Sequence, residues 1–465
     1  MRKRFLVTTA LLTLTVALRA SIVLAQDLPR GQVVDEVKCA GDPTQSYALY
    51  LPSNYSRDRT WSLLLALHPA ARGRAMVDAY RAAAEKYGYI VAGSNNSRNG
   101  PWQVSIASIQ AMSADLEQRV SIDANRVYLT GLSGGARVAM QVALSSKIVA
   151  GVIASSAGYP DSKPRKSLPF VVFGTAGTED FNYIELRMLD RALTTPHRLA
   201  IFEGGHTLPP EHVVLDAIEW LELQAMKSGR KTRDEALIDQ LFDTRQRAIA
   251  ASTSPAAIAH LLKDLADDFN GLRDVSAAAA RASELSKQKD VKSALARQRA
   301  DDDAEARQLD EVFALEAGVR DESRHLESLG RLRDWLSRCA RQADAAADSP
   351  ERRRARRVLR AITMGAADRV QDGEYLKLLQ QYRQPGTGRG ARDHVREAKP
   401  PETQPRKHEG TKKTYSFSCF RVFVVAFFHA EVDYAACADC LSSSRRLLRS
   451  RSRSMLSRPA AARCT

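Results

Sequence analysis

A Gly-x-Ser-x-Gly motif between a strand-like and a helix-like segment constrains this chain most strongly. The β-prone residues 126–130 lead into residues 131–135 (GLSGG), and a helical pattern follows at once. The flanking glycines have no side chains to collide where strand and helix pass so close. Such a turn strains the serine backbone and projects the hydroxyl above the sheet edge. It leaves the amide of Gly134 free at the helix N-terminus to bind an oxyanion. The motif predicts a nucleophilic Ser133; an ordinary glycine-rich turn with an idle serine is the alternative.

Alternating strand-like and helix-like segments surround this motif, from residue 31 to about residue 229. Apolar runs of five or six residues that alternate with helical periodicity are typical of a parallel sheet covered on both faces. The first two strand-like segments have no helix between them and should pair as a hairpin at one edge. The eight strand-like segments are residues 32–37, 46–51, 62–67, 89–93, 126–130, 150–154, 169–173 and 198–202. Helical patterns cover residues 76–87, 106–120, 136–144, 183–193 and 213–226.

Eight strands with the motif after the fifth match the strand count of the α/β-hydrolase fold, and this region resembles that superfamily. Residues 122–135 (IDANRVYLTGLSGG) are more narrowly similar to the secreted esterases grouped with polyhydroxybutyrate depolymerases and feruloyl esterases. The resemblance covers less than half of the chain and implies an eight-stranded, mostly parallel sheet. One departure is Pro69, which stands where relatives usually have the glycine of an HG motif.

The resemblance implies an acid after the seventh strand and a base after the eighth. Both places are occupied, the second by His206 on a glycine-hinged loop. His206 can take the serine proton and later give it to the leaving group, while a carboxylate behind it fixes its tautomer. We assign the acid to Asp180 rather than the adjacent Glu179. Residues 177–180 resemble the Gly-x-x-Asp turn of these esterases, and the shorter side chain suits a rigid turn.

Four other residues near the predicted site have alternative interpretations. His212 is a rival base, but it follows two prolines and enters the last helix, so it should face away. His68 ends a buried strand and should hydrogen-bond backbone near the oxyanion loop. Because Pro69 has no amide proton, Ala70 is the nearest candidate for the second oxyanion donor. Trp102 either lines the acyl pocket or packs as a surface-loop aromatic on the following helix.

The connection between the sixth and seventh strands is short. Only residues 158–167 lie there, at the place where hydrolases with a buried lipid site usually insert a helical lid. We therefore expect an open site that accepts a soluble or an extended polymeric ester.

The first 25 residues have the pattern of a secretory signal peptide. Residues 2–4 are basic, residues 5–18 form an apolar run too short to span a bilayer comfortably, and residues 23–25 offer small side chains for cleavage. We expect a secreted or periplasmic protein whose catalytic domain covers residues 26–229.

A helical region is predicted for residues 230–383, which contain no strand-like segment. Apolar residues recur there at helical spacing, and residues 252–255 and 348–350 have the serine and proline of helix starts. Six or so helices are expected. Such a region either binds a protein partner or packs as a scaffold against the hydrolase.

Residues 384–465 read as a disordered, low-complexity basic tail that accounts for most of the net charge. The whole chain of 465 residues carries +15, and residues 381–465 contain 17 Lys and Arg against 7 Asp and Glu, which leaves +10. The rest is nearly balanced, so no nucleic-acid partner is expected. Residues 416–430 are apolar but too short and charged to span a membrane. The Cys437–Cys440 pair lacks the further ligands of a metal site.

Together these patterns predict a serine hydrolase that cleaves carboxylic esters through an acyl-enzyme. Ser133 attacks, His206 relays the proton, Asp180 orients the histidine, and the amides of Gly134 and Ala70 hold the oxyanion. No cofactor or metal is needed for this chemistry. A serine peptidase is one alternative, because the triad does not distinguish esters from amides. A non-catalytic protein that binds partners through its helical region is the other.

Overall fold

The computed structural model describes residues 28–160 and 165–382. The predicted signal peptide and basic tail therefore lie outside the described residues. All described residues belong to one compact unit, and the predicted domain boundary near residue 229 stays a prediction.

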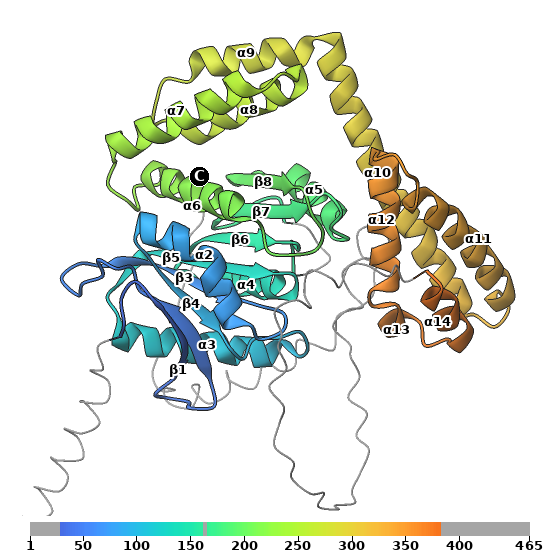
Figure 1. Cartoon of the computed structure of the whole chain (residues 1–465), viewed down its shortest axis with the longest axis horizontal. Coiled ribbons are helices and arrows are strands. Elements are labelled where there is room, and N and C mark those ends of the chain that lie inside the picture. The colour runs from blue at the N-terminus through green and yellow to red at the C-terminus, as the bar shows by residue number, and fades with distance from the viewer. Residues whose placement is uncertain (1–27, 161–164, 383–465) are drawn as a thin grey trace, which may run out of the picture. The chain divides into compact units, whose positions relative to one another are not determined.

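An eight-stranded sheet forms the centre of the first half of the chain (Figure 1). Its strand order is β1-β2-β4-β3-β5-β6-β7-β8. β1 and β2 form the expected antiparallel hairpin at one edge, β2 pairs antiparallel with β4, and all remaining pairs are parallel. This is the α/β-hydrolase fold, and the predicted fold class is confirmed. The strands are β1 Val33–Lys38, β2 Ser46–Tyr50, β3 Trp61–Leu67, β4 Tyr89–Ser94, β5 Ile122–Leu132, β6 Val149–Ser155, β7 Val171–Gly177 and β8 His197–Phe202.

One strand differs from its predicted bounds in a way that matters for the site. β7 continues to Gly177, whereas the pattern predicted an end at Phe173. Three of the residues 174–177 are glycine or alanine, which have little strand propensity, but all four pair with β8, and Gly174 and Thr175 also pair with β6. The residues that follow β7 therefore begin at Thr178, two residues before the predicted acid.

Helices cover both faces of the sheet, as the alternating pattern predicts (Figure 1). α2 (Gly73–Tyr87) and α6 (Glu211–Lys227) share one apolar core with the sheet. α3 (Trp102–Arg119), α4 (Gly134–Ser145) and α5 (Tyr183–Ala192) share the core on the other face. Each core is formed by alternate side chains of the same strands.

The described chain after α6 is helical, with eight helices where six or so were expected. Ser254 and Ser349 cap α8 and α12 and precede a proline, which confirms the predicted helix starts. The additional elements are short or weakly patterned: α13 has four residues, and α9 buries little besides Ala282. The helices are α7 Glu235–Ala251, α8 Pro255–Phe269, α9 Ser276–Lys287, α10 Lys289–Val319, α11 His325–Ala343, α12 Pro350–Thr363, α13 Ala366–Arg369 and α14 Gly373–Gln380.

The helical region packs onto the hydrolase part through two apolar clusters. Leu223 and Met226 of α6 pack with residues of α7 and α8, including Ile238 and Phe269. The core of α10–α14 contains Ile184 of α5, and Phe181 packs against it. The predicted packing against the hydrolase is therefore present at the segment that follows β7.

Two absences hold within the described residues. No helix there is long and apolar enough to cross a membrane. No cluster of side chains there could hold a metal ion.

Asp115 anchors α3 to the sheet and offers a test of this arrangement. Its buried carboxylate accepts hydrogen bonds from the Arg119 guanidinium at 2.6 Å, the Tyr47 hydroxyl at 2.7 Å and the Ala40 amide at 2.8 Å. Burial opposes ionisation, but these donors outweigh it and lower the pKa of Asp115.

We expect Asp115→Asn to lower the free energy of unfolding by about 1–3 kcal/mol at pH 7, because buried donors lose a charged acceptor. The folded-state pKa of Asp115 lies below its unfolded-state pKa of about 3.9, so ionisation of Asp115 stabilises the folded protein above about pH 3.9. This stabilisation is lost as the pH falls through the folded-state pKa. Urea unfolding at pH 7 and pH 3 measures this: the gap between wild type and variant should narrow at pH 3. A gap that is independent of pH would contradict it.

Candidate active site

Ser133 occupies the strained turn that the motif predicts. It lies between β5 and α4 with φ 54° and ψ −122°, a backbone conformation that residues other than glycine rarely adopt. Its amide donates to the Ser155 carbonyl at 2.8 Å, and its carbonyl accepts from the Ala136 amide at 2.9 Å. These bonds at the end of β6 and the start of α4 hold the turn in place.

The two glycines of the motif are required by close backbone contacts. A Cβ atom on Gly131 would lie 2.3 Å from the carbonyl carbon of Gly135. A Cβ atom on Gly135 would lie 2.3 Å from the Leu67 carbonyl oxygen. Both distances are far below van der Waals contact, so strand and helix can approach this closely only with glycine at these positions.

The acid and the base predicted from the sequence are brought together. Nδ1 of His206 lies 2.8 Å from Oδ1 of Asp180, which also accepts the Asn182 amide at 2.9 Å. The two residues lie on the segments that follow β7 and β8, which are adjacent parallel strands and end at the same sheet edge. Asp180 is fully buried and His206 is partly exposed, which suits an orienting carboxylate behind a working imidazole.

Glu179, the rival acid, is engaged elsewhere. Its carboxylate accepts from Nη1 of Arg356 at 2.7 Å and lies 3.5 Å from Nη1 of Arg360. These contacts turn it toward α12. The contacts therefore support Asp180 as the partner of His206.

The contact between Ser133 and His206 is not made in this state. Within the described part of the chain, no hydrogen bond joins the Ser133 hydroxyl to the imidazole. Phe181 lies beside the histidine, with ring centroids 4.0 Å apart and planes inclined by 23°. Catalytic hydrogen bonds are often long without substrate and tighten in the complex, so the observed separation is compatible with a triad.

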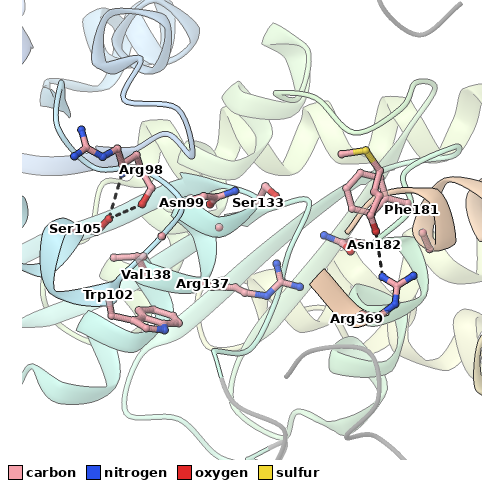
Figure 2. Close-up of a pocket in the computed structure, with 14 residues that line it drawn as sticks. Arg98, Asn99, Trp102, Ser105, Ser133, Arg137, Val138, Phe181, Asn182 and Arg369 are labelled. Carbon is pink, nitrogen blue, oxygen red and sulfur yellow. Dashed lines mark hydrogen bonds between the residues drawn. The ribbon is translucent and has the colours of Figure 1, made fainter. Parts of the chain in front are cut away.

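A small cavity lies beside Ser133 (Figure 2). Its volume is about 90 Å³, and its apolar lining includes Trp102, Val138, Phe181 and Met364. Trp102 is the first residue of α3, lines this cavity and packs against the apolar core. Its role in binding an acyl group stays a prediction. A larger cleft of about 1170 Å³ contains His206 and shares Phe181 and Met364 with the cavity.

The wall formed by Met364 was not expected. The short connection between β6 and β7 predicts an open site. Ala361 of α12 and Met364 directly after it nevertheless line the cavity. The wall comes from a segment far along the chain, so the length of that connection contains no signal for it.

The two predicted oxyanion donors differ in their surroundings. Among the described residues, no acceptor takes the Gly134 amide at the N-terminus of α4. The Ala70 amide, in contrast, donates to Nδ1 of His68 at 3.0 Å and is already engaged. His68 hydrogen-bonds backbone, as its position predicts. The role of Ala70 as an oxyanion donor therefore stays a prediction. Its amide would first have to break the hydrogen bond to His68.

Asn99 is a site residue that sequence reasoning missed. Its side-chain amide contacts Gly134, where a Cβ atom would lie 1.9 Å from Oδ1 of Asn99. It lines the same cavity as Ser133 (Figure 2), and its own backbone amide donates to the Pro69 carbonyl at 2.8 Å. An asparagine before Gly-Pro is explained by turn formation alone, so the sequence gives no signal for this role.

Comparisons with known proteins add little to this geometry. No protein-family model and no curated protein matches the sequence. Among solved structures, esterase B from Lactobacillus rhamnosis has 15% identity and a TM-score of 0.36, over 50% of this chain and 98% of that chain. The S-formylglutathione hydrolase of Staphylococcus aureus has 16% identity and a TM-score of 0.33, over 42% of this chain and 99% of that chain. A feruloyl esterase module from Clostridium thermocellum has 14% identity and a TM-score of 0.30, over 38% of this chain and 82% of that chain. The fold assignment rests on the sheet topology of the chain itself.

His68 should remain neutral at physiological pH. Burial, with a contribution from Arg72, lowers its pKa to about 4. The neutral ring is the form that accepts the Ala70 amide. Because this value lies below the unfolded one of about 6.5, the unfolded chain binds more protons between them, and stability falls as the pH falls through that window.

NMR titration of labelled imidazoles measures this directly. We expect one histidine, assigned through His68→Gln, to stay neutral until the pH approaches about 4. A titration midpoint near 6.5 for His68 would show that the ring does not accept the buried amide.

Proposed function

We propose that the protein is a serine hydrolase that cleaves carboxylic esters through an acyl-enzyme. One observation carries this: Ser133 stands in a strained turn at the sheet edge where Asp180 and His206 are hydrogen-bonded at 2.8 Å. The backbone strain at Ser133, with φ 54°, lowers the stability of the fold. Such strain is typical of sites where a hydroxyl must be presented to a substrate.

The hydrogen bond between His206 and Asp180 determines which nitrogen of the imidazole can accept a proton. With Nδ1–H donated to Oδ1 of Asp180, Nε2 is left as the free base. Nε2 takes the Ser133 proton as Oγ forms a bond to the ester carbonyl carbon, and gives that proton to the departing alcohol as the C–O bond breaks. Water then attacks the acyl-enzyme by the same route, releasing the acid and restoring the serine.

The Gly134 amide and the Asn99 side chain are our candidates for the oxyanion donors. The Gly134 amide is at the N-terminus of α4, where the helix dipole favours negative charge. Oδ1 of Asn99 is the atom nearest Gly134, and the donor Nδ2 would lie 3.6 Å from a Cβ atom there, whereas the Ala70 amide is occupied by His68. Nδ2 is the atom that would donate to an oxyanion. A side-chain amide next to the nucleophile supplies the donor that Pro69 cannot.

The volumes of the cavity beside Ser133 and of the cleft that contains His206 favour an ester with a small acyl group. A cavity of about 90 Å³ with an apolar lining fits a short acyl chain, and the cleft of about 1170 Å³ beside His206 offers room for a larger alcohol part. Small-molecule esters and the ends of polymeric esters both meet this description. Export directed by residues 1–25 is part of the same proposal.

Labelling with a fluorophosphonate probe tests the proposed nucleophile. We expect wild-type protein to be labelled, and labelling to be lost in Ser133→Ala and strongly reduced in His206→Ala, because only an activated serine reacts. His212→Ala is the matched control and should be labelled like wild type. An unlabelled wild type would favour a protein that binds partners through its helical region. Hydrolysis of peptide amides in preference to aryl esters would favour a peptidase.

The proposed role of Asn99 is tested by Asn99→Leu, which keeps the volume but removes the donor. We expect kcat to fall about 10²–10³-fold with little change in KM, because the lost bond forms only in the transition state. Circular dichroism controls for folding. A kcat within threefold of wild type would exclude Asn99 and return the donor role to Ala70.

A further inference from the structure

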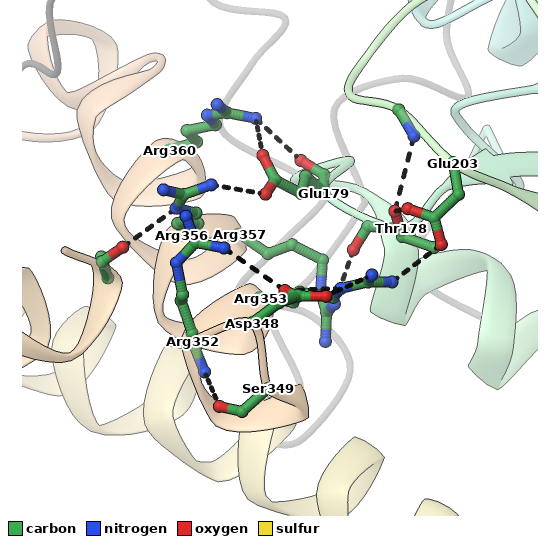
Figure 3. Close-up of polar contacts among 12 residues, drawn as sticks. Thr178, Glu179, Glu203, Asp348, Ser349, Arg352, Arg353, Arg356, Arg357 and Arg360 are labelled. Atoms are coloured by element: carbon green, nitrogen blue, oxygen red, sulfur yellow. Dashed lines mark hydrogen bonds and ion pairs between the residues drawn. The ribbon is translucent and has the colours of Figure 1, made fainter. Parts of the chain in front are cut away.

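One face of α12 carries a row of arginines that contacts the two segments holding the acid and the base (Figure 3). Arg353, Arg356, Arg357 and Arg360 recur at helical spacing and lie on one side of α12. On those two segments they contact Glu203, Glu179 and the backbone of residues 178 and 179. These partners directly precede Asp180 or lie three residues before His206.

Arg357 is the most deeply buried member of the row. Its Nε lies 3.0 Å from both carboxylate oxygens of Glu305 on α10, and its Nη1 donates to the Thr178 carbonyl at 2.7 Å. The guanidinium carbon also lies 4.2 Å from the ring centroid of Tyr183. A planar group fixed by a buried carboxylate on one edge has little freedom, so it holds the Thr178 carbonyl at a defined place.

Arg360 continues this anchoring by one residue. Its Nη1 donates to the Glu179 carbonyl at 3.1 Å and lies 3.5 Å from the Glu179 carboxylate. The same nitrogen lies beside Gly205, where a Cβ atom would be 3.4 Å away. Arg360 therefore binds the residue before the acid and lies near the residue before the base.

The carboxylate of Asp180 depends on its backbone for orientation. Oδ1 has two partners, the Asn182 amide and His206, but Oδ2 is buried with no hydrogen-bond partner in the described structure. On the inner side, the Asn182 side chain ties the segment to the Ser156 carbonyl at 2.8 Å. On the outer side, arginines of α12 donate to the carbonyls of Thr178 and Glu179, whose amides donate to the carbonyls of Phe202 and Gly204. A displacement of this backbone would move Oδ1 away from the imidazole, and Oδ2 has no hydrogen-bond partner among the described residues that would hold the carboxylate in place.

We infer that α12 is a positioning element of the site: Arg357 and Arg360 hold residues 178 and 179 so that Asp180 meets His206. This role rests on the proposed function. It makes the helical region part of the catalytic unit, because α12 then helps to position a catalytic residue. The arginines touch neither substrate nor serine, so they act through Asp180.

Two variants remove the contacts without leaving an unpaired buried charge. Arg360→Ala truncates a partly exposed side chain. Arg357→Met combined with Glu305→Met replaces the buried ion pair by apolar side chains of similar length, a change that buried pairs often tolerate. Arg354→Ala is the matched control, because Arg354 lies on the same helix but pairs with Asp301 of α10.

Two readouts separate positioning from general stabilisation. The first is kcat and KM with an aryl ester: we expect kcat to fall about ten- to a hundredfold in both test variants, with KM nearly unchanged, because a misplaced acid impairs the chemical step. The second is the far-downfield proton resonance of the His206 ring, assigned by its loss in His206→Gln. It should weaken or shift in both test variants, as in Asp180→Ala, and remain in Arg354→Ala.

The inference is overturned if both test variants fold, keep kcat within twofold of wild type and retain an unchanged His206 resonance. If wild-type protein neither reacts with the fluorophosphonate nor cleaves esters, the proposed function fails. The resonance then still reports whether α12 sets the contact between Asp180 and His206, so the two failures are distinguishable.

Discussion

The site depends on two backbone hydrogen bonds between the segment that follows β7 and the end of β8 with the residues after it. The Glu179 amide donates to the Gly204 carbonyl at 2.8 Å, and the Thr178 amide donates to the Phe202 carbonyl at the same distance. This continues the pairing of the two strands past their ends and places acid and base side by side. It requires glycine at position 177, where a Cβ atom would lie 2.4 Å from the Gly204 carbonyl oxygen. A larger residue there would force the two segments apart and separate Asp180 from His206.

Largely buried ion pairs join the helices of the helical region to one another and join α10 to α5 of the hydrolase part. Arg357 pairs with Glu305, Arg369 pairs with Glu316, and Asp302 of α10 accepts from Arg191 of α5. The desolvation of such groups offsets much of their attraction, so these pairs add little net stability. Their directional bonds instead select one arrangement of α10 and α12 against the hydrolase part, which an apolar interface alone would specify less sharply.

Much of the sheet and part of the site could be predicted because the signals are local. Periodicity marks the strands and helices, and the glycines around Ser133 mark the turn. The engagement of Ala70, the position of Asn99 and the contacts of α12 could not be predicted in this way. Each depends on which segment lies opposite in space. Arg357 has the same chemistry as any surface arginine, and only the neighbouring Thr178 carbonyl and Glu305 give it a role.

The arginine contacts have a consequence for the order of events during synthesis. They join residues 177 to 181 positions apart, so α12 leaves the ribosome long after β7 and β8. Contacts of such large sequence separation form late in folding. A nascent chain that has completed its sheet but not α12 lacks the outer ties of its acid. A chain that ends before α12 would keep the backbone bonds between the segments after β7 and β8 but would lack the arginine contacts to residues 178 and 179, so on the proposal above it would hold Asp180 less firmly.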